Sequence, residues 1–245
     1  MNALEIRGLT KQRGDFALQG LDLTLPAGCI MGLIGENGAG KSTTIRLILN
    51  ALSRDGGTVA VYGKDNRALT PLEREDIGAV LDEVGLPEYM TARQIGRMMA
   101  GIFTRWQPEV YRDYLRRLAL PEDKPFRDFS RGMKMKLGLA AALSHQPKLL
   151  LLDEATSGLD PVVRDEILTI FADFTRDEEH AVLISSHIVS DLEKICDYIA
   201  FLHRGRLLLC EEKDRLTEEY GILRGGTDGI APAAVCGRHA TPYGT

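Results

Sequence analysis

The segment at residues 35–42 constrains this chain more than any other part of its sequence. It reads Gly-Glu-Asn-Gly-Ala-Gly-Lys-Ser, which fits the pattern G-x-x-x-x-G-K-[ST]. A continuous apolar run at 29–34 precedes it and predicts a strand buried on both faces. Apolar residues at helical spacing follow it and predict a helix over 41–52. A glycine-rich turn in this context predicts a phosphate-binding loop, because its backbone N–H groups and the helix N-terminus attract anions.

This loop predicts a bound nucleoside triphosphate with a metal ion. The glycines let the backbone curl around phosphate oxygens, Lys41 bridges the β- and γ-phosphates, and Ser42 offers its hydroxyl to Mg²⁺. The residues expected to contact the nucleotide here are Gly35, Glu36, Asn37, Gly38, Ala39, Gly40, Lys41, Ser42 and Thr43.

Two acidic residues follow a second buried strand. Four leucines at 149–152 end in Asp153 and Glu154. A phosphate-binding loop needs a carboxylate on a neighbouring strand to organise Mg²⁺, and Asp153 is the candidate. Glu154 is placed to polarise an attacking water, so we assign it as the general base. The alternative is a solvated acidic pair that only ends a core strand.

The rest of the chain predicts an α/β fold with three parts. Short alternating pieces separated by glycines at 4–25 predict an N-terminal antiparallel β subdomain. Residues 91–120 lack strand alternation and predict helices in a separate inserted lobe, at about 88–145 in full. Alternating strands and helices elsewhere predict a mainly parallel sheet in one domain over 1–220. The sequence after it, 221–245, lacks periodicity and is expected to be a weakly ordered tail. The remaining elements expected are helices at 133–145 and 161–176, and strands at 148–152, 181–184, 198–203 and 206–210.

Composition limits the possible partners. Thirty Lys and Arg residues against thirty-five Asp and Glu residues give a net charge of −5, which disfavours nonspecific binding to nucleic acid. The four cysteines are far apart, so we expect neither a disulfide framework nor a zinc site. The first residues lack a signal-peptide pattern and no apolar run approaches the roughly 18 residues of a membrane helix. Any role at a membrane is therefore expected to use a partner chain.

Several motifs, in order, resemble those of the ATP-binding cassette ATPases, the nucleotide-binding subunits of ABC transporters. The likeness runs over residues 4–216. Besides the glycine-rich loop, the Phe-Ser-Arg-Gly-Met segment at 129–133 is similar to the family's L-S-G-G-Q signature, and 157–160 is similar to its D-loop. His187 matches its switch histidine. The resemblance implies a P-loop NTPase fold, ATP as the nucleotide, ATP hydrolysis, and catalytic roles for Glu154 and His187.

The signature segment has a physical interpretation of its own. Ser130 can cap the helix that follows, and Gly132 permits close backbone approach, so a second anion site is expected at a helix N-terminus. The resemblance implies a head-to-tail dimer in which Ser130 and Gly132 of one copy cover the ATP held by Lys41 of the other. Arg131 and Met133 depart from the family pattern. Arg131 either strengthens binding of the γ-phosphate or faces solvent.

Two further positions are assigned by alignment with the family. Asp82 aligns with the glutamine of the Q-loop and becomes a third candidate Mg²⁺ ligand beside Ser42 and Asp153, although an Asp is shorter and charged. The aromatic residue that stacks on adenine falls nearest Arg13, with Phe16 close by, and either side chain could stack on adenine. Phe16 could equally be a core residue.

The resemblance implies an ATPase subunit that drives export through a separate integral membrane permease, most like bacterial ABC-2-type subunits. We therefore expect the chain in the cytoplasm, peripheral on the inner face of the cell membrane. The helical lobe, with Met98, Met99, Phe103 and Trp106, is expected to dock on the permease or to form an ordinary amphipathic core, and both can be true. A soluble cassette ATPase with a regulatory or ribosome-associated role is the alternative function.

Overall fold

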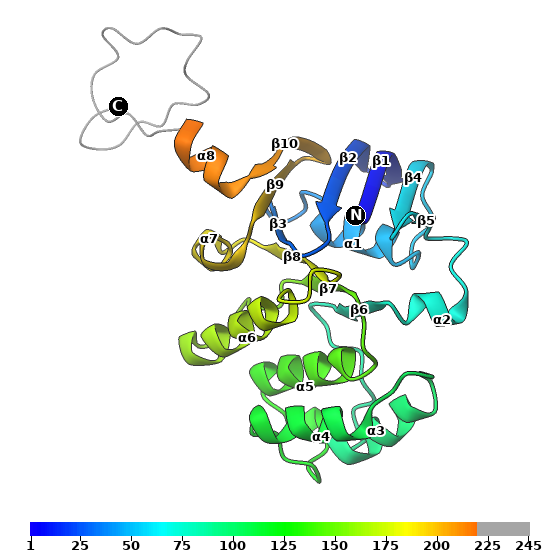
Figure 1. The fold of residues 1–245 in the computed structure, drawn as a ribbon, viewed down its shortest axis with the longest axis vertical. Helices are drawn as coiled ribbons and strands as arrows, with labels where there is room; N and C mark the ends of the chain where they lie inside the picture. The colour runs from blue at the N-terminus through cyan, green and yellow to red at the C-terminus, as the bar shows by residue number, and fades with distance from the viewer. Residues whose placement is uncertain (220–245) are drawn as a thin grey trace, which may run out of the picture. The chain divides into compact units, whose positions relative to one another are not determined.

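The computed structural model describes residues 1–219 (Figure 1). Met1–Lys213 form one compact unit, and the described part of a second unit is the rest of helix α8 (Lys213–Glu219). The tail expected at 221–245, and Cys236 within it, lie outside the described residues. Within 1–219, no helix is both long and apolar enough to cross a membrane.

Two sheets form the frame of the compact unit. A four-stranded antiparallel sheet has the order β2-β1-β4-β5, and a six-stranded sheet has the order β10-β9-β3-β8-β7-β6. In the second sheet every neighbouring pair is parallel except the β9–β10 hairpin, which agrees with the mainly parallel sheet expected. The first sheet contains β1 (Asn2–Arg13), β2 (Phe16–Pro26), β4 (Gly56–Val61) and β5 (Lys64–Asp65). The second contains β3 (Ile30–Ile34), β6 (Ile77–Val80), β7 (Leu149–Asp153), β8 (Ala181–Ser186), β9 (Tyr198–His203) and β10 (Arg206–Glu212).

The six-stranded sheet is buried on both faces, as the uninterrupted apolar runs predict. Successive side chains of a strand point to opposite faces. Leu150 and Leu152 pack with the helices, whereas Leu149 and Leu151 pack with α1 (Lys41–Ile48) and the antiparallel sheet. All four leucines are fully buried. The helices on the first face include α5 (Arg131–Leu143), α6 (Pro161–Phe174) and α7 (Val189–Ile195).

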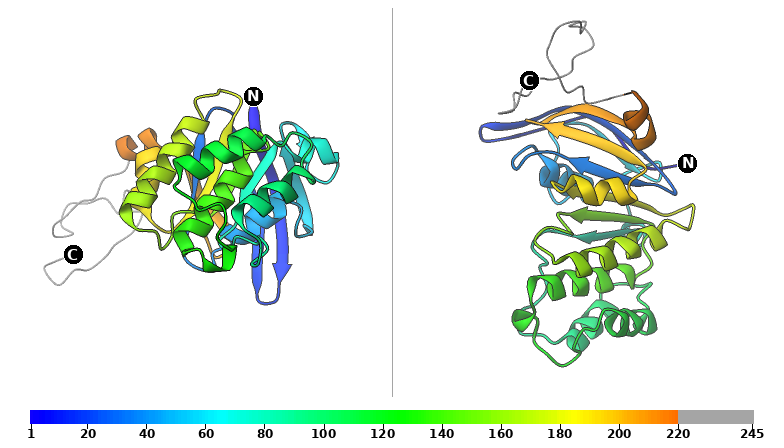
Figure 2. Two further views of the ribbon diagram at one scale, coloured as in Figure 1. Left: turned by 90° about the horizontal axis from the view of Figure 1, so that it is seen from below. Right: turned by 90° about the vertical axis from the view of Figure 1, so that its left-hand side faces the viewer.

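A helical insertion extends the chain beyond the β6 edge of the sheet (Figure 2). It consists of α3 (Ala92–Ala100), α4 (Pro108–Arg117), a 3₁₀ turn (Phe126–Asp128) and α5. Met99 and Trp106 pack against its core, and Phe103 stacks on His145 with ring centroids 4.1 Å apart. These contacts favour the core alternative for Met99, Trp106 and Phe103.

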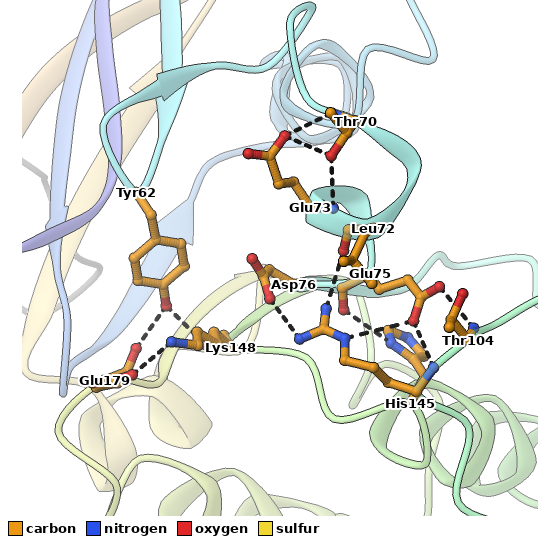
Figure 3. Close-up of polar contacts among 11 residues, drawn as sticks. Tyr62, Thr70, Leu72, Glu73, Glu75, Asp76, Thr104, His145, Lys148 and Glu179 are labelled. Atoms are coloured by element: carbon orange, nitrogen blue, oxygen red, sulfur yellow. Dashed lines mark hydrogen bonds and ion pairs between the residues drawn. The ribbon is translucent and has the colours of Figure 1, made fainter.

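A polar joint fastens the insertion to the sheet just before β6 (Figure 3). Glu75, which follows the short helix α2 (Pro71–Arg74), accepts hydrogen bonds from the backbone N–H groups of Thr104 and Arg105 at 2.8 and 2.9 Å. The Arg105 guanidinium pairs with Asp76 at 2.8 Å, and His145 Nδ1 lies 3.1 Å from the Glu75 carbonyl oxygen. Because every bond here joins the loop between α3 and α4, or the end of α5, to the residues before β6, the joint fixes the insertion at this edge.

Most expected elements form with shifted ends. The helix expected at 41–52 ends at Ile48, and that expected at 133–145 begins at Arg131 because Ser130 is its N-cap. Asp160 caps α6 through the Val163 N–H, with Pro161 in the first position, as the sequence indicates. The strands β4, β5 and β6 are not predicted separately from the sequence, because they are short.

Candidate nucleotide-binding site

The candidate residues meet because three neighbouring strands run in the same direction. The strands β3, β8 and β7 are adjacent and parallel, so Ile34, Ser186 and Asp153 end at one edge of the sheet. The glycine-rich loop follows β3, Glu154 follows β7, and His187 follows β8. A ligand site at the carboxyl ends of the strands is the general arrangement of open α/β sheets.

The loop at 35–42 has the conformation that its glycines allow. Gly38 and Gly40 have φ angles of 81° and 115°, in the region that L side chains rarely adopt. A Cβ at Gly35 would lie 2.4 Å from the Leu202 carbonyl oxygen, and one at Gly40 would lie 2.8 Å from the Phe16 ring. Gly35 is therefore required by close packing, Gly38 by backbone conformation, and Gly40 by both.

Lys41 is buried at the start of α1 and turns back over the loop. Its ammonium group donates to the Gly35 carbonyl at 2.7 Å and to the Glu36 carbonyl at 3.3 Å. It also lies 3.2 Å from Glu154 Oε1. Since α1 begins at Lys41 and has no side-chain N-cap, its first N–H groups point at the same space as this cation. The arrangement is suited to oxygen atoms of a polyphosphate.

Glu154 connects the three strand ends. Its second oxygen, Oε2, lies 2.7 Å from His187 Nδ1, so one carboxylate contacts both Lys41 and His187. The side chain of Glu154 is only 14% exposed. Its φ angle is 52°, which is uncommon for a residue other than glycine. Strain of this kind is maintained where the surroundings fix the backbone, and here the Glu154 N–H donates to Ser185 Oγ at 3.0 Å.

Ser185 is a site residue that the sequence analysis did not identify. Its hydroxyl donates to Asp153 Oδ1 at 2.6 Å while accepting from the Glu154 N–H, so it orients both acidic residues. Ser185 and Asp153 are opposite each other in the β7–β8 register. The available signal in the sequence was a serine two residues before His187, directly after the apolar run at 181–184.

The second anion site expected from the signature segment has the predicted cap. Ser130 Oγ accepts from the Met133 N–H at 3.3 Å, and α5 begins directly after it with no acidic residue in its first turn. Arg131, in contrast, is paired with Asp82, with Nη2 and Oδ1 2.9 Å apart. The Arg131 side chain is 55% exposed, so it faces solvent while it pairs with Asp82. A contact with the γ-phosphate stays a prediction.

Both candidates for contact with adenine lie at the hairpin of β1 and β2. Arg13 and Phe16 are opposite each other across the turn. Phe16 is half-buried against the glycine-rich loop, at Gly40, whereas Arg13 is exposed. The structure therefore places the Phe16 ring beside the phosphate-binding loop, with Arg13 opposite it in the hairpin.

Comparison with known proteins points to one family. The family model described as "ABC transporter" matches residues 18–157. The ABC transporter ATP-binding protein YtrB of Bacillus subtilis (strain 168) is 32% identical over 218 residues, which cover 89% of this chain and 74% of that protein. The lantibiotic transport ATP-binding protein SrtF of Streptococcus pyogenes is 32% identical over 214 residues, covering 86% and 91%. A solved ATP-binding subunit of an ABC transporter has a TM-score of 0.80 at 26% identity, covering 89% of this chain and 92% of that one.

Proposed function

This chain belongs to the ABC transporter family as an ATP-binding subunit with ATPase activity, and from that premise we propose how its own residues bind and hydrolyse ATP. The observation that carries the proposal is the position of Glu154 between Lys41 and His187. One carboxylate that contacts a phosphate-binding cation on one side and an imidazole on the other is suited to act on a water beside the γ-phosphate.

Binding of ATP changes the partners of Lys41. The phosphate oxygens carry more charge than a carboxylate and reach the Lys41 ammonium together with the N–H groups of residues 38–43. They compete with Glu154 Oε1, which lies 3.2 Å from Lys41 Nζ. Glu154 released from Lys41 accepts a proton from the attacking water, while His187 holds the other oxygen and faces the γ-phosphate.

The donor set fits Mg²⁺ bound mainly through the nucleotide. Among the described residues no group of three His, Cys, Asp or Glu side chains could hold a metal by itself. Mg²⁺ in such sites takes most ligands from phosphate oxygens and water, with one or two from the protein. Ser42 would supply a hydroxyl and Asp153 would act from the end of β7, held by Ser185. The ion supplies charge that neutralises the phosphates during transfer.

The proposal extends to partners of the chain. Two copies joined head to tail would place Ser130 and Gly132 of one copy over the ATP bound by the other, and a membrane permease would turn closure of that dimer into transport, as a ligand-driven shift between two conformations. Relatives include the Nod factor export ATP-binding protein I of Rhizobium sp. (strain N33), 35% identical over 225 residues. We propose export as the direction of transport, with the chain at the inner face of the cell membrane.

Purification of the tagged chain from detergent-solubilised native membranes tests the transport role. We expect a polytopic membrane protein in about equal amount, identified by mass spectrometry, and we expect Lys41→Ala to retain it. Recovery of ribosomes, or of the chain alone, would instead favour a cassette ATPase with a regulatory or ribosome-associated role.

A further inference from the structure

Arg131 contacts two loops that the sequence separates widely. Its Nη2 atom lies 2.9 Å from Asp82 Oδ1 in the loop after β6. On its other side, a Cβ built on Gly158 would lie 3.0 Å from Nη1 and 3.3 Å from Cζ, so the guanidinium covers that glycine in the loop after β7. Gly158 has a φ angle of 69°, which also favours glycine. One side chain thus joins the signature segment, the loop after β6 and the loop after β7.

The sheet brings these loops together. The strands β6 and β7 are parallel neighbours, with Val80 opposite Leu152 near their carboxyl ends, so both loops leave the sheet at the edge that carries Glu154. The N-terminus of α5 meets the second loop at one more point, because a Cβ on Gly132 would lie 3.6 Å from the buried Leu159 side chain. Arg131 therefore adds a polar contact to an apolar one between the same two segments.

We propose that Arg131 is a positioning residue that fixes the signature segment against the loop at 154–160, and that Asp82 acts on ATP hydrolysis by holding Arg131. The inference deepens the proposed function and rests on it. Glu154 begins the loop that Arg131 covers, and the Ser157 N–H bonds to the Glu154 carbonyl at 3.0 Å, so movement of Gly158 is transmitted to the residue that acts on water. Asp82 then needs no direct bond to Mg²⁺ in order to influence the reaction.

The Arg131–Asp82 pair is suited to position the loop at 154–160 rather than to stabilise the fold. Arg131 and Asp82 side chains are 55% and 53% exposed, and exposed ion pairs add little to folding stability. A planar guanidinium can nevertheless lie flat on a backbone while its edge donates to a carboxylate, which Lys cannot do. Loss of either partner should therefore alter the rate of hydrolysis without unfolding the chain.

A double-mutant cycle on the full chain separates this role from Mg²⁺ binding by Asp82. The variants are Asp82→Asn, Arg131→Met and the two combined. We expect each single change to lower kcat by about five- to tenfold, an effect of the size usually measured for two residues in contact. The double variant should be no slower than either single variant, because both changes break the same contact. The Mg²⁺ concentration that gives half the maximal rate should remain that of the wild type. The matched control is Arg117→Met with Asp173→Asn, which removes an exposed ion pair between α4 and α6.

Two results would overturn the proposal. A further loss of rate from Asp82→Asn in the Arg131→Met background, or a raised Mg²⁺ requirement, would show that Asp82 acts at the metal. Unchanged rates in both single variants would show that the ion pair has no role. Wild type and Lys41→Ala in the same assay keep the proposed function separate: hydrolysis by the first and not by the second supports the site whatever the cycle gives.

Amide hydrogen exchange of the nucleotide-free chain provides a readout that does not require turnover. We expect Asp82→Asn and Arg131→Met to speed exchange in peptides that cover 154–160, and the Arg117→Met control to leave those peptides unchanged. Unchanged exchange in all three variants would contradict the positioning role.

Discussion

Glu154 lies where the carboxyl ends of the parallel strands of the six-stranded sheet meet, which we call the carboxyl edge. Glu75 lies at the opposite ends of these strands, which we call the amino edge. The two carboxylates are held by different kinds of partner. Glu154, after β7, contacts two side chains, Lys41 and His187. Glu75, before β6, is held by two backbone N–H groups of the 101–107 loop. Both carboxylates are largely buried. Glu154 is thus held through side chains that phosphate oxygens could also bind, whereas Glu75 is held mainly through backbone N–H groups of the chain itself.

The electrostatics of Glu75 agree with this difference. Burial by itself raises the pKa of Glu75, but the N–H groups of Thr104 and Arg105 and the charge of Arg105 outweigh it, so the pKa lies below its ordinary value. A carboxylate satisfied in this way is a fixed structural bond. We infer that Glu154, at the carboxyl edge, changes its partners when the nucleotide binds, whereas Glu75, at the amino edge, keeps its partners and holds the helical insertion in place.

The largest expected effect comes from Glu154→Gln. The amide cannot accept the proton of the attacking water, so we expect the hydrolysis rate to fall about 10²- to 10⁴-fold, the usual contribution of a general base, with ATP still bound. The same substitution at the amino edge, Glu179→Gln, removes an exposed partner of Lys148 and should leave the rate unchanged. Steady-state phosphate release measures both. Wild-type turnover by Glu154→Gln would remove Glu154 from the reaction.

A smaller effect is expected for Lys41→Ala on nucleotide affinity. Loss of charge-assisted bonds to phosphate should weaken ATP binding by about 1.5–3 kcal/mol, which is roughly 10- to 150-fold in Kd. The counterpart at the amino edge, Lys148→Ala, should bind ATP as the wild type does. Isothermal titration calorimetry compares the two. Equal affinities of wild type and Lys41→Ala would place the phosphates elsewhere.

Glu75→Ala should change stability and not chemistry. It leaves the N–H groups of Thr104 and Arg105 without their acceptor, and we expect about 1–3 kcal/mol lower free energy of unfolding. Glu109→Ala, which breaks an exposed pair with Arg112 inside α4, is the control and should lower it by less than about 0.5 kcal/mol. Urea denaturation gives both values. A stable Glu75→Ala variant that hydrolysed ATP slowly would reverse the comparison between the edges.

The smallest effect is a pH dependence at the amino edge. Burial lowers the pKa of His145 from its usual 6.5, so the unfolded chain binds a proton that the folded chain rejects. Stability from this group is complete above pH 6.5 and declines as the pH falls toward the folded pKa, by at most about 1.4 kcal/mol per pH unit. Wild type should therefore lose stability relative to His145→Phe between pH 7 and pH 5.5, about the range where an unperturbed histidine titrates. A constant difference across that range would exclude His145 as the cause.

The two edges also differ in how far the sequence predicts them. The glycine-rich loop, Asp153 and Glu154 are recognised because the signal is local: a buried strand, a turn and a helix in consecutive residues. The joint at Glu75 has no such signal, since its donors are backbone N–H groups of a loop nearly 30 residues away, which any sequence there would present.

The pairing of Arg131 with Asp82 was missed for a related reason. The two residues are 49 positions apart, and their segments meet because α5 packs at Gly138 against Val80 of β6 and Val84 of the loop that follows it. Ser185 could have been found, because a serine in a buried strand needs a partner for its hydroxyl. Ser130 is correctly predicted as the cap of α5, but the predicted helix starts at residue 133, whereas α5 starts at Arg131, directly after the cap.

The most direct test of the central claim is amide hydrogen exchange of the Glu154→Gln chain with and without ATP and Mg²⁺. We expect nucleotide to slow amide exchange in peptides that cover 35–44, 153–160 and 185–188, and to leave exchange unchanged in those that cover 73–77 and 103–107. Protection by ATP of the peptides at 73–77 and 103–107, or of no peptide, would contradict the claim that the nucleotide binds at the Glu154 edge of the sheet and that the Glu75 edge only holds the insertion.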